Sequence, residues 1–185
     1  MRRFVLLDRD GTINVEKGYV LDPDDLEPIP GAIEAMRDLT SLGLGLVVVT
    51  NQSPVGRGLL TPDRLERIHD CLRAILREGG VELLGIYVCP HRPEEGCDCR
   101  KPSPGLAIRA AGEHGFDLER AFVVGDHRSD VEMGRRVGAT TILLRTGHGP
   151  QEIERGAAAF ADHVVDDLRA AAGVIGKLVL EGATG

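Results

Sequence analysis

A short apolar run that ends abruptly in two carboxylates stands near the start of the chain: Phe4-Val5-Leu6-Leu7-Asp8-Arg9-Asp10-Gly11-Thr12. Asp8 and Asp10 interrupt the apolar residues too early for a signal peptide or a membrane span. The run therefore predicts a buried first strand, and with it a chain that stays in the cytoplasm.

Short apolar runs alternate with helix-like stretches over the rest of the chain. Several runs are rich in Val and Ile, as strands buried on both faces should be; the expected strands are residues 4–7, 44–49, 84–88, 121–124, 141–144 and 163–165. The expected helices are residues 31–42, 61–77, 103–114, 129–137 and 167–180. Thr61-Pro62 and Ser103-Pro104 are typical helix starts, with a capping hydroxyl before a proline.

This alternation predicts a doubly wound, mostly parallel α/β sheet of Rossmann-like type, with helices on both faces. With 185 residues, a single domain over residues 1–185 is expected. A net charge of −7 argues against a nucleic-acid partner, and no run approaches a membrane span. An anionic substrate would have to be attracted by local cations rather than by the whole molecule.

Asp8 and Asp10 would repel each other unless a cation or a shared proton compensates. A divalent metal leaves one aspartate free to attack phosphorus and form an acyl-phosphate, while the other protonates the leaving group and then activates water. Neighbouring N–H groups around Gly11 can hold phosphate oxygens. The alternative is an ordinary polar turn, since Asp-Gly is a common turn signal.

Two later strand ends, at Thr50 and Asp126, and the Arg100-Lys101 pair before a predicted helix carry matching chemistry. Thr50, after the second run, suits a phosphate-oxygen donor, and Lys101 could neutralise phosphoryl charge in the transition state. Asp126 is placed to bind Mg²⁺. Asp130 either holds the metal through a water or caps the next helix. In a doubly wound sheet, ligands bind at the carboxyl ends of the strands, where these residues fall.

Three of the four cysteines are clustered beside a histidine. Cys89, His91, Cys97 and Cys99 would fill a tetrahedral zinc shell, so the loop at residues 89–100 predicts a closed, structural zinc site. Cys71 is expected to fill the core. Because the loop leads directly into Arg100-Lys101, folding around zinc would position those cations.

Together these motifs resemble the haloacid dehalogenase superfamily of phosphohydrolases. Its motifs are matched in order by Asp8–Thr12, Thr50, Lys101 and Gly125–Asp130, over nearly the whole chain. The zinc loop and the absence of room for a cap domain between Asp10 and Gly31 resemble two of its families, the D-glycero-D-manno-heptose 1,7-bisphosphate 7-phosphatases and the histidinol-phosphate phosphatases.

The first family is favoured by a flap at about residues 13–29, by the Thr50–Gly58 segment and by the segment after the zinc loop. The resemblance implies that Asp8, Asp10, through its backbone carbonyl, and Asp126 bind Mg²⁺. It implies that Thr50, Arg100 and Lys101 stabilise the phosphoryl group. The implied substrate-binding residues are Glu16, Lys17, Gly18, Tyr19, Asn51, Gln52, Ser53, Arg57 and His127.

The chain departs from the family at His127, where lysine is often found, and at Pro54, where glycine is common. Of the remaining histidines, His69 is expected at a surface or satisfied position, and His148 could border the site.

The expected activity is Mg²⁺-dependent hydrolysis of the 7-phosphate of the heptose bisphosphate through a phosphoaspartate. The alternatives are a histidinol-phosphate phosphatase, a phosphotransferase and a non-catalytic, zinc-stabilised binding domain. A small sugar phosphate is the expected partner, and a monomer is the expected state.

Overall fold

Six parallel strands form one sheet in the computed structural model, which describes residues 2–182. The strand order is β3-β2-β1-β4-β5-β6. The strands are β1 (Phe4–Leu7), β2 (Gly45–Asn51), β3 (Gly85–Cys89), β4 (Phe122–Gly125), β5 (Thr140–Leu144) and β6 (His163–Val165). Every pairing is parallel, which confirms the predicted doubly wound sheet.

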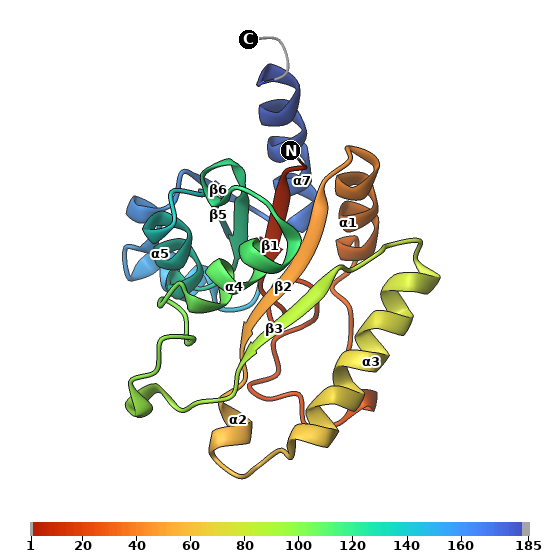
Figure 1. Cartoon of the computed structure of the whole chain (residues 1–185), viewed down its shortest axis with the longest axis vertical. Helices are drawn as coiled ribbons and strands as arrows, with labels where there is room; N and C mark the ends of the chain where they lie inside the picture. The colour runs from red at the N-terminus through yellow and green to blue at the C-terminus, as the bar shows by residue number, and fades with distance from the viewer. Residues whose placement is uncertain (1, 183–185) are drawn as a thin grey trace.

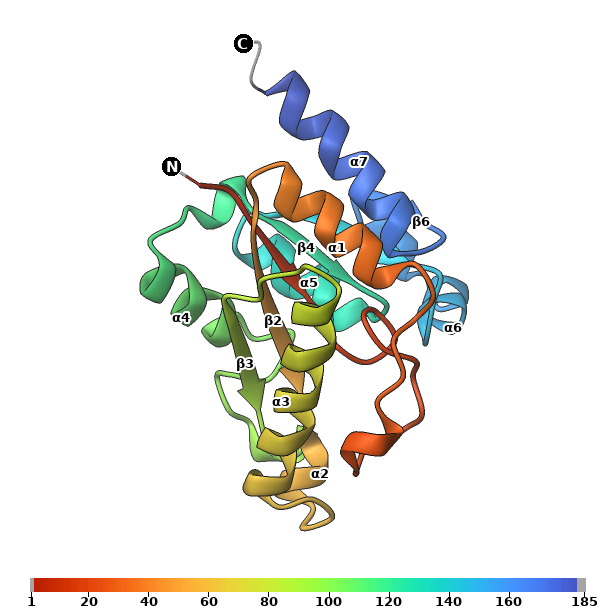
Figure 2. The ribbon, with the colours of Figure 1, turned by 90° about the vertical axis from the view of Figure 1, so that its right-hand side faces the viewer.

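Helices cover both faces of the sheet. They are α1 (Ala32–Ser41), α2 (Ser53–Gly56), α3 (Pro62–Glu78), α4 (Gly105–His114), α5 (Arg128–Arg136), α6 (Gly149–Glu154) and α7 (Leu168–Glu181). Short 3-10 turns lie at Pro23–Asp25, Pro93–Glu95, Leu118–Arg120 and Ala157–Phe160. Figure 1 shows α1 and α3 on one side of the sheet and α4 and α5 on the other, and Figure 2 shows α7 beside α1.

Alternation along the strands divides the core between the two faces. Val5 and Leu7 belong to the cluster under α1, α3 and α7, whereas Phe4 and Leu6 belong to the cluster under α4 and α5. Successive side chains of a strand point to opposite faces, so a strand that is apolar at every position is buried on both. This burial is why the apolar runs could be recognised as strands.

The predicted helix starts had different outcomes. The Thr61 hydroxyl accepts a hydrogen bond from the Arg64 N–H and caps α3 as predicted. The Ser103 cap was wrong, because α4 begins at Gly105 with Pro104 in the capping position and without a side-chain cap. Helices α2 and α6 were not predicted; each is less than two turns long and begins beside proline, which is also typical of loops.

The flap between β1 and α1 is a small structure fixed to the body at both ends. The Val15 N–H donates to the carbonyl of Glu27, and the Ile29 N–H donates to that of Ile13. Arg64 of α3 pairs with Asp22 in the flap. No helix within residues 2–182 is both long and apolar enough to cross a membrane.

Candidate active site

A cavity of about 220 Å³ opens at the carboxyl ends of the central strands. From β1 the chain builds the sheet outward through β2 and β3, and then returns to place β4 on the other side of β1. The ends of β1 and β4 therefore flank the point where the winding reverses, which is where doubly wound sheets bind ligands. The lining residues are Asp8, Asp10, Glu16, Gly18, Tyr19, Val20, Thr50, Asn51, Gln52, Pro54, Arg100, Lys101, Asp126, His127, Ser129 and His148.

Lys101 joins the carboxylates at the floor of this cavity. Its Nζ lies 2.8 Å from Asp8 Oδ1, 2.6 Å from Asp130 Oδ1 and 2.7 Å from the carbonyl oxygen of Val49. Burial would lower the pKa of Lys101, but the two carboxylates outweigh it and raise the pKa. The side chain is thus held as an ammonium directly beside Asp8.

Three aspartates, the half-buried Asp8 and the buried Asp126 and Asp130, lie around this ammonium, which pairs with Asp8 and Asp130. Oxygens of Asp8, Asp126 and Asp130 lie within 4.8 Å of one another. Burial raises the pKa of Asp8 to about 7 despite Lys101, and burial together with the Asp8 charge raises that of Asp126 to about 8. Carboxylates crowded in this way are a favourable environment for a hard divalent cation, which prefers oxygen ligands.

Glycines make room for these carboxylates. A Cβ on Gly11 or on Gly147 would lie 2.2 Å from Asp126 Oδ2, and both glycines have positive φ angles. The Asp126 carboxylate is also held by the His148 N–H at 2.7 Å. Gly11 in the first motif is therefore required for the close approach of β1 and β4, in addition to its conformation.

Asp130 acts as a helix cap in the structure. Its Oδ2 accepts the His127 N–H at 3.1 Å at the start of α5, and its Oδ1 contacts Lys101. Asp130 thus completes the capping box of α5, in which His127 is the N-cap, and it pairs with the lysine; its oxygens also belong to the carboxylate group that could hold a metal ion.

Asp10 lies in a dense hydrogen-bond network. Arg9 donates to both of its carboxylate oxygens, Asn14 Nδ2 donates to Oδ1 at 2.9 Å, and Gln52 Nε2 donates to Oδ2 at 2.8 Å. Burial would raise the pKa of Asp10, but Arg9 and the amide donors outweigh it and lower the pKa. Gln52 also donates to Thr50 Oγ1 at 2.9 Å, linking the acid to the threonine.

Cations and polar groups surround the mouth of the cavity. Arg100 lines it and donates from Nη1 to the carbonyl oxygen of His91 at 3.1 Å. The rings of His127 and His148 meet edge to face, with centroids 6.1 Å apart. His148 Nε2 lies 3.5 Å from Glu16 Oε2, so the flap contacts the loop after β5 across the opening.

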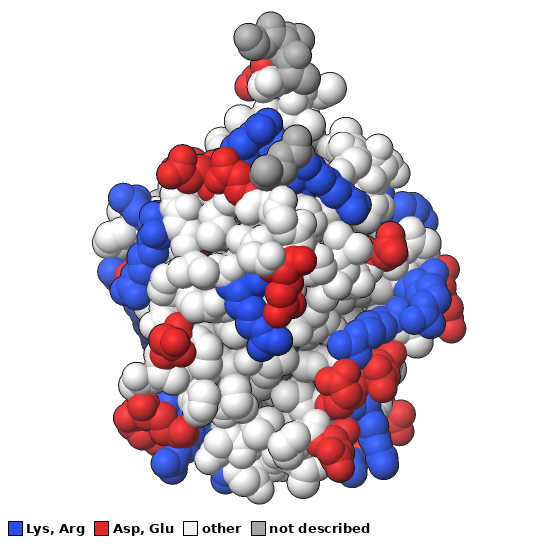
Figure 3. Space-filling model, in the orientation of Figure 1, with Lys and Arg blue, Asp and Glu red and all other residues white. Residues whose placement is uncertain are grey.

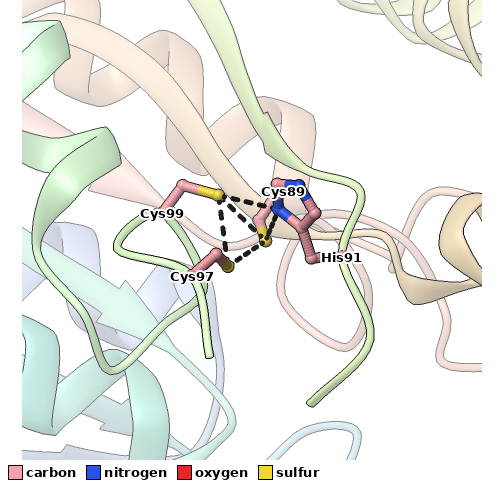
Figure 4. Close-up of side chains that lie close together, drawn as sticks. All are labelled: Cys89, His91, Cys97 and Cys99. Atoms are coloured by element: carbon pink, nitrogen blue, oxygen red, sulfur yellow. Dashed lines mark hydrogen bonds between the residues drawn. The ribbon is translucent and has the colours of Figure 1, made fainter. Parts of the chain in front are cut away.

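Four side chains converge in the loop after β3 (Figure 4). The sulfur atoms of Cys89, Cys97 and Cys99 lie 3.3–3.6 Å apart, and His91 Nδ1 lies 3.2 Å from Cys99 Sγ. Tetrahedral zinc with Zn–S bonds of about 2.3 Å separates its sulfur ligands by about 3.8 Å, so the donor set fits a zinc ion closely. The four residues can hold a metal. Cys71 lies apart on α3 and packs against the core as predicted.

Most of the predicted site residues line the cavity. Fifteen site residues were predicted outside the Cys/His cluster. Three of these fifteen do not line the cavity: Lys17, Ser53 and Arg57. Lys17 pairs with Glu27 within the flap, Ser53 is buried at the start of α2, and Arg57 is exposed at its end. The cavity adds Val20, Pro54, Ser129 and His148. Of these, His148 had a sequence signal, because it stands in a Gly-His-Gly turn after a predicted strand, and Pro54 departs from the family pattern.

Comparisons with known proteins agree with this architecture. A family model described as HAD-hydrolase-like matches residues 98–171. A D-glycero-β-D-manno-heptose-1,7-bisphosphate 7-phosphatase of Pseudomonas putida is 41% identical, covering 92% of this chain and 97% of its own length. The enzyme of that name from Escherichia coli is 43% identical, covering 77% and 79%.

A solved structure shows the same similarity in three dimensions. It is a D,D-heptose 1,7-bisphosphate phosphatase from B. bronchiseptica complexed with magnesium and phosphate, with a TM-score of 0.89 and 34% identity over 95% of this chain and 98% of that one. The chain therefore belongs to the haloacid dehalogenase-like hydrolases, and within them to the family of the heptose-1,7-bisphosphate 7-phosphatases.

Proposed function

We propose that this chain is a cytoplasmic, single-domain phosphatase that removes the 7-phosphate of D-glycero-β-D-manno-heptose 1,7-bisphosphate and releases the heptose 1-phosphate. The observation that carries this proposal is the convergence of Asp8, Asp126 and Lys101 at the reversal of the sheet winding. The substrate and its β anomer follow the names of the relatives.

The residues divide the reaction into two displacements. Asp8 attacks phosphorus and forms a phosphoaspartate, while Lys101 and the Thr50 hydroxyl stabilise the equatorial oxygens. Asp10 donates a proton to the departing sugar oxygen and then takes one from the water that hydrolyses the phosphoaspartate. Arg100, at the mouth, assists in holding the phosphoryl group.

Metal binding follows from the donor sets. Mg²⁺ would be held by the side chains of Asp8 and Asp126 and by the backbone carbonyl of Asp10. When bound, it supplies charge neutralisation between the nucleophile and the phosphoryl oxygens. The Cys89, His91, Cys97 and Cys99 cluster would hold a structural Zn²⁺ with no open position.

The flap, the end of β2 and the start of α5 supply the remaining proposed substrate contacts. Glu16, Gly18 and Tyr19 of the flap, together with Asn51, Gln52 and His127, line the cavity beyond Asp8. We place the sugar and its remote phosphate against these residues. Lys17, Ser53 and Arg57 do not line the cavity, so they would contact the substrate only after the flap or α2 had moved toward it.

The test is a phosphate-release screen with purified enzyme and Mg²⁺. The substrates are both anomers of the heptose bisphosphate, histidinol phosphate and fructose 1,6-bisphosphate. The β heptose bisphosphate should give the highest kcat/KM, and Asp8→Asn should abolish turnover in a protein that remains folded. A preference for histidinol phosphate would reject the substrate, and near-normal turnover by Asp8→Asn would reject the mechanism.

A further inference from the structure

Arg9 is a fully buried cation in the middle of the first motif. Its Nε and Nη2 donate to Asp10 Oδ1 at 3.1 and 2.9 Å, and Nη2 also donates to Asp10 Oδ2 at 2.7 Å. A second acceptor, Gln52 Oε1, lies 3.2 Å from Nη2. Planar guanidinium groups that bind a carboxylate in this two-pronged way fix its orientation as well as its charge.

The remaining side of the guanidinium faces α3. His69, only 1% exposed, places Nε2 at 3.2 Å from Arg9 Nη1, although sixty residues separate the two in the sequence. Arginine can only donate, so Nε2 must be the unprotonated nitrogen, and the ring proton sits on Nδ1. Nδ1 points toward Glu66, whose Oε2 lies 3.9 Å away.

The environment of His69 keeps its ring neutral. The charged groups that face it are Arg9 and Asp10 from the end of β1, and Glu66 and Arg73 from α3 itself. Burial is the largest effect, followed by the Arg9 charge, and they lower the pKa of His69 to about 4. A protonated imidazole would have no lone pair for Arg9 and would oppose its charge.

We propose that His69 is a positioning residue for the reaction: its neutral imidazole fixes the guanidinium of Arg9, which in turn fixes the Asp10 carboxylate where the leaving group needs its proton. This inference rests on the proposed function, because it assigns a purpose to the orientation of Asp10. It extends the site from the strand ends to the buried face of α3, to which Leu65, Ile68 and Leu72 also belong.

The dependence on the leaving group separates positioning from a general structural role. A sugar alkoxide needs a proton when it departs, whereas p-nitrophenolate departs without one. In His69→Leu, which fills the buried position with an apolar side chain and removes the acceptor, kcat/KM for the sugar bisphosphate should fall by about 10- to 100-fold, which is part of the roughly 10²- to 10⁴-fold contribution of general-acid catalysis. The fall with p-nitrophenyl phosphate should be less than about threefold.

Two variants serve as matched controls. His69→Gln retains an acceptor for Arg9 and should recover most of the activity on the sugar. Ile68→Ala removes buried volume from the same face of α3 without touching the network, and should change the two substrates equally. An equal loss with both substrates in His69→Leu, or no loss, would overturn the proposal.

Two measurements remain informative if His69→Leu folds poorly or if the wild type hydrolyses no phosphate monoester. Nitrogen NMR of the folded wild type should find the proton of His69 on Nδ1 with Nε2 as acceptor; a proton on Nε2 would overturn the proposal. In a crystal structure of His69→Gln, the Asp10 side chain should have the same rotamer as in the wild type. If the wild type shows this tautomer and this rotamer but hydrolyses no substrate, the proposed function is rejected, whereas the contacts of Arg9 with His69 and Asp10 stand.

Discussion

Lys101 shows how a single residue can set the electrostatics of this site. It is 4% exposed, and its ammonium lies between the carboxylates of Asp8 and Asp130. A buried ion pair is sensitive to the loss of one partner, because the other charge is then left buried and unpaired. The same ammonium is also the nearest cation to the proposed nucleophile.

We therefore expect Lys101→Met to lose both activity and stability. The kcat should fall by at least about 100-fold, since a preorganised charge beside the phosphoryl group is removed. The free energy of unfolding should fall by about 3 kcal/mol, because the carboxylates of Asp8 and Asp130 lose the cation that pairs with both. Steady-state kinetics and urea unfolding measure the two effects. Lys177→Met, at an exposed position on α7, should alter neither; a Lys101→Met enzyme with wild-type kcat would contradict the role of the ammonium.

His69 should make folding stability depend on pH. Its pKa is lowered to about 4 in the folded chain, against an ordinary value of about 6.5, so the unfolded chain binds more protons between these values. The stability contribution is present above pH 6.5 and is lost as the pH falls toward 4. Between pH 7 and pH 5, wild type should lose about 2 kcal/mol more than His69→Gln, which does not titrate there. Urea unfolding at both pH values tests this; parallel losses in the two proteins would contradict it.

The sequence predicted residues that stand at strand ends better than residues that meet through the fold. Asp8, Thr50 and Asp126 lie together as expected, because parallel strands present their carboxyl ends at one edge, and Lys101 reaches the same place from the segment between β3 and α4. The contact between Arg9 and His69 left no sequence signal. It depends on how α3 packs across the sheet, and a buried histidine on an apolar helix face looks the same with or without such a partner.

Within a single element, the loop after β3, the Cys/His cluster is connected to the cavity. Its cluster holds Cys97 and His91, and the His91 carbonyl accepts a hydrogen bond from Arg100, which lines the cavity. Any change in the cluster is therefore transmitted to a side chain beside the substrate.

Loss of a zinc ligand should loosen this element. Cys97→Ser should bind less than one zinc per chain, lower Tm by about 5–10 °C and raise KM through displacement of Arg100. Metal analysis, thermal unfolding and steady-state kinetics measure these effects. Cys71→Ser, on α3 outside the cluster, should keep its zinc and its KM. A Cys97→Ser protein with full zinc content or unchanged melting would contradict a structural metal site.

Helices and strands with a long, regular apolar pattern were predicted correctly, whereas short helices were not. All six strands and the five longer helices were located from the sequence, whereas α2 and α6 were missed. A four-residue or six-residue helix shows too few turns for a period to be visible, and proline and glycine within it are equally typical of loops. Thr50 was placed after its strand but lies within β2, because β2 extends to Asn51, beyond its apolar residues.

At the scale of the whole molecule, the net negative charge does not attract an anionic substrate, so the attraction has to come from the cavity. The chain carries a net charge of −7, and positive and negative side chains are interspersed over the face in Figure 3. The groups that attract phosphate are therefore Lys101 and Arg100 with any bound metal, which act over short distances.

We propose that the folded chain is a monomer in solution, and its exposed apolar side chains support this proposal. Among the described residues, the exposed large ones are 39–64% exposed and belong to five different segments: Tyr19, Leu42, Leu59, Ile108 and Leu180. Stable dimers usually bury a contiguous apolar patch on each partner, which side chains dispersed in this way do not supply. The open edge of the sheet at β3 is the main site for self-association, but it is only five residues long and leads directly into the Cys/His loop. Light scattering on the zinc-loaded protein should therefore give the mass of one chain up to about 100 µM, well above the concentrations at which standard-size interfaces assemble. A mass of two chains in that range would contradict the monomer and would direct attention to pairing along β3.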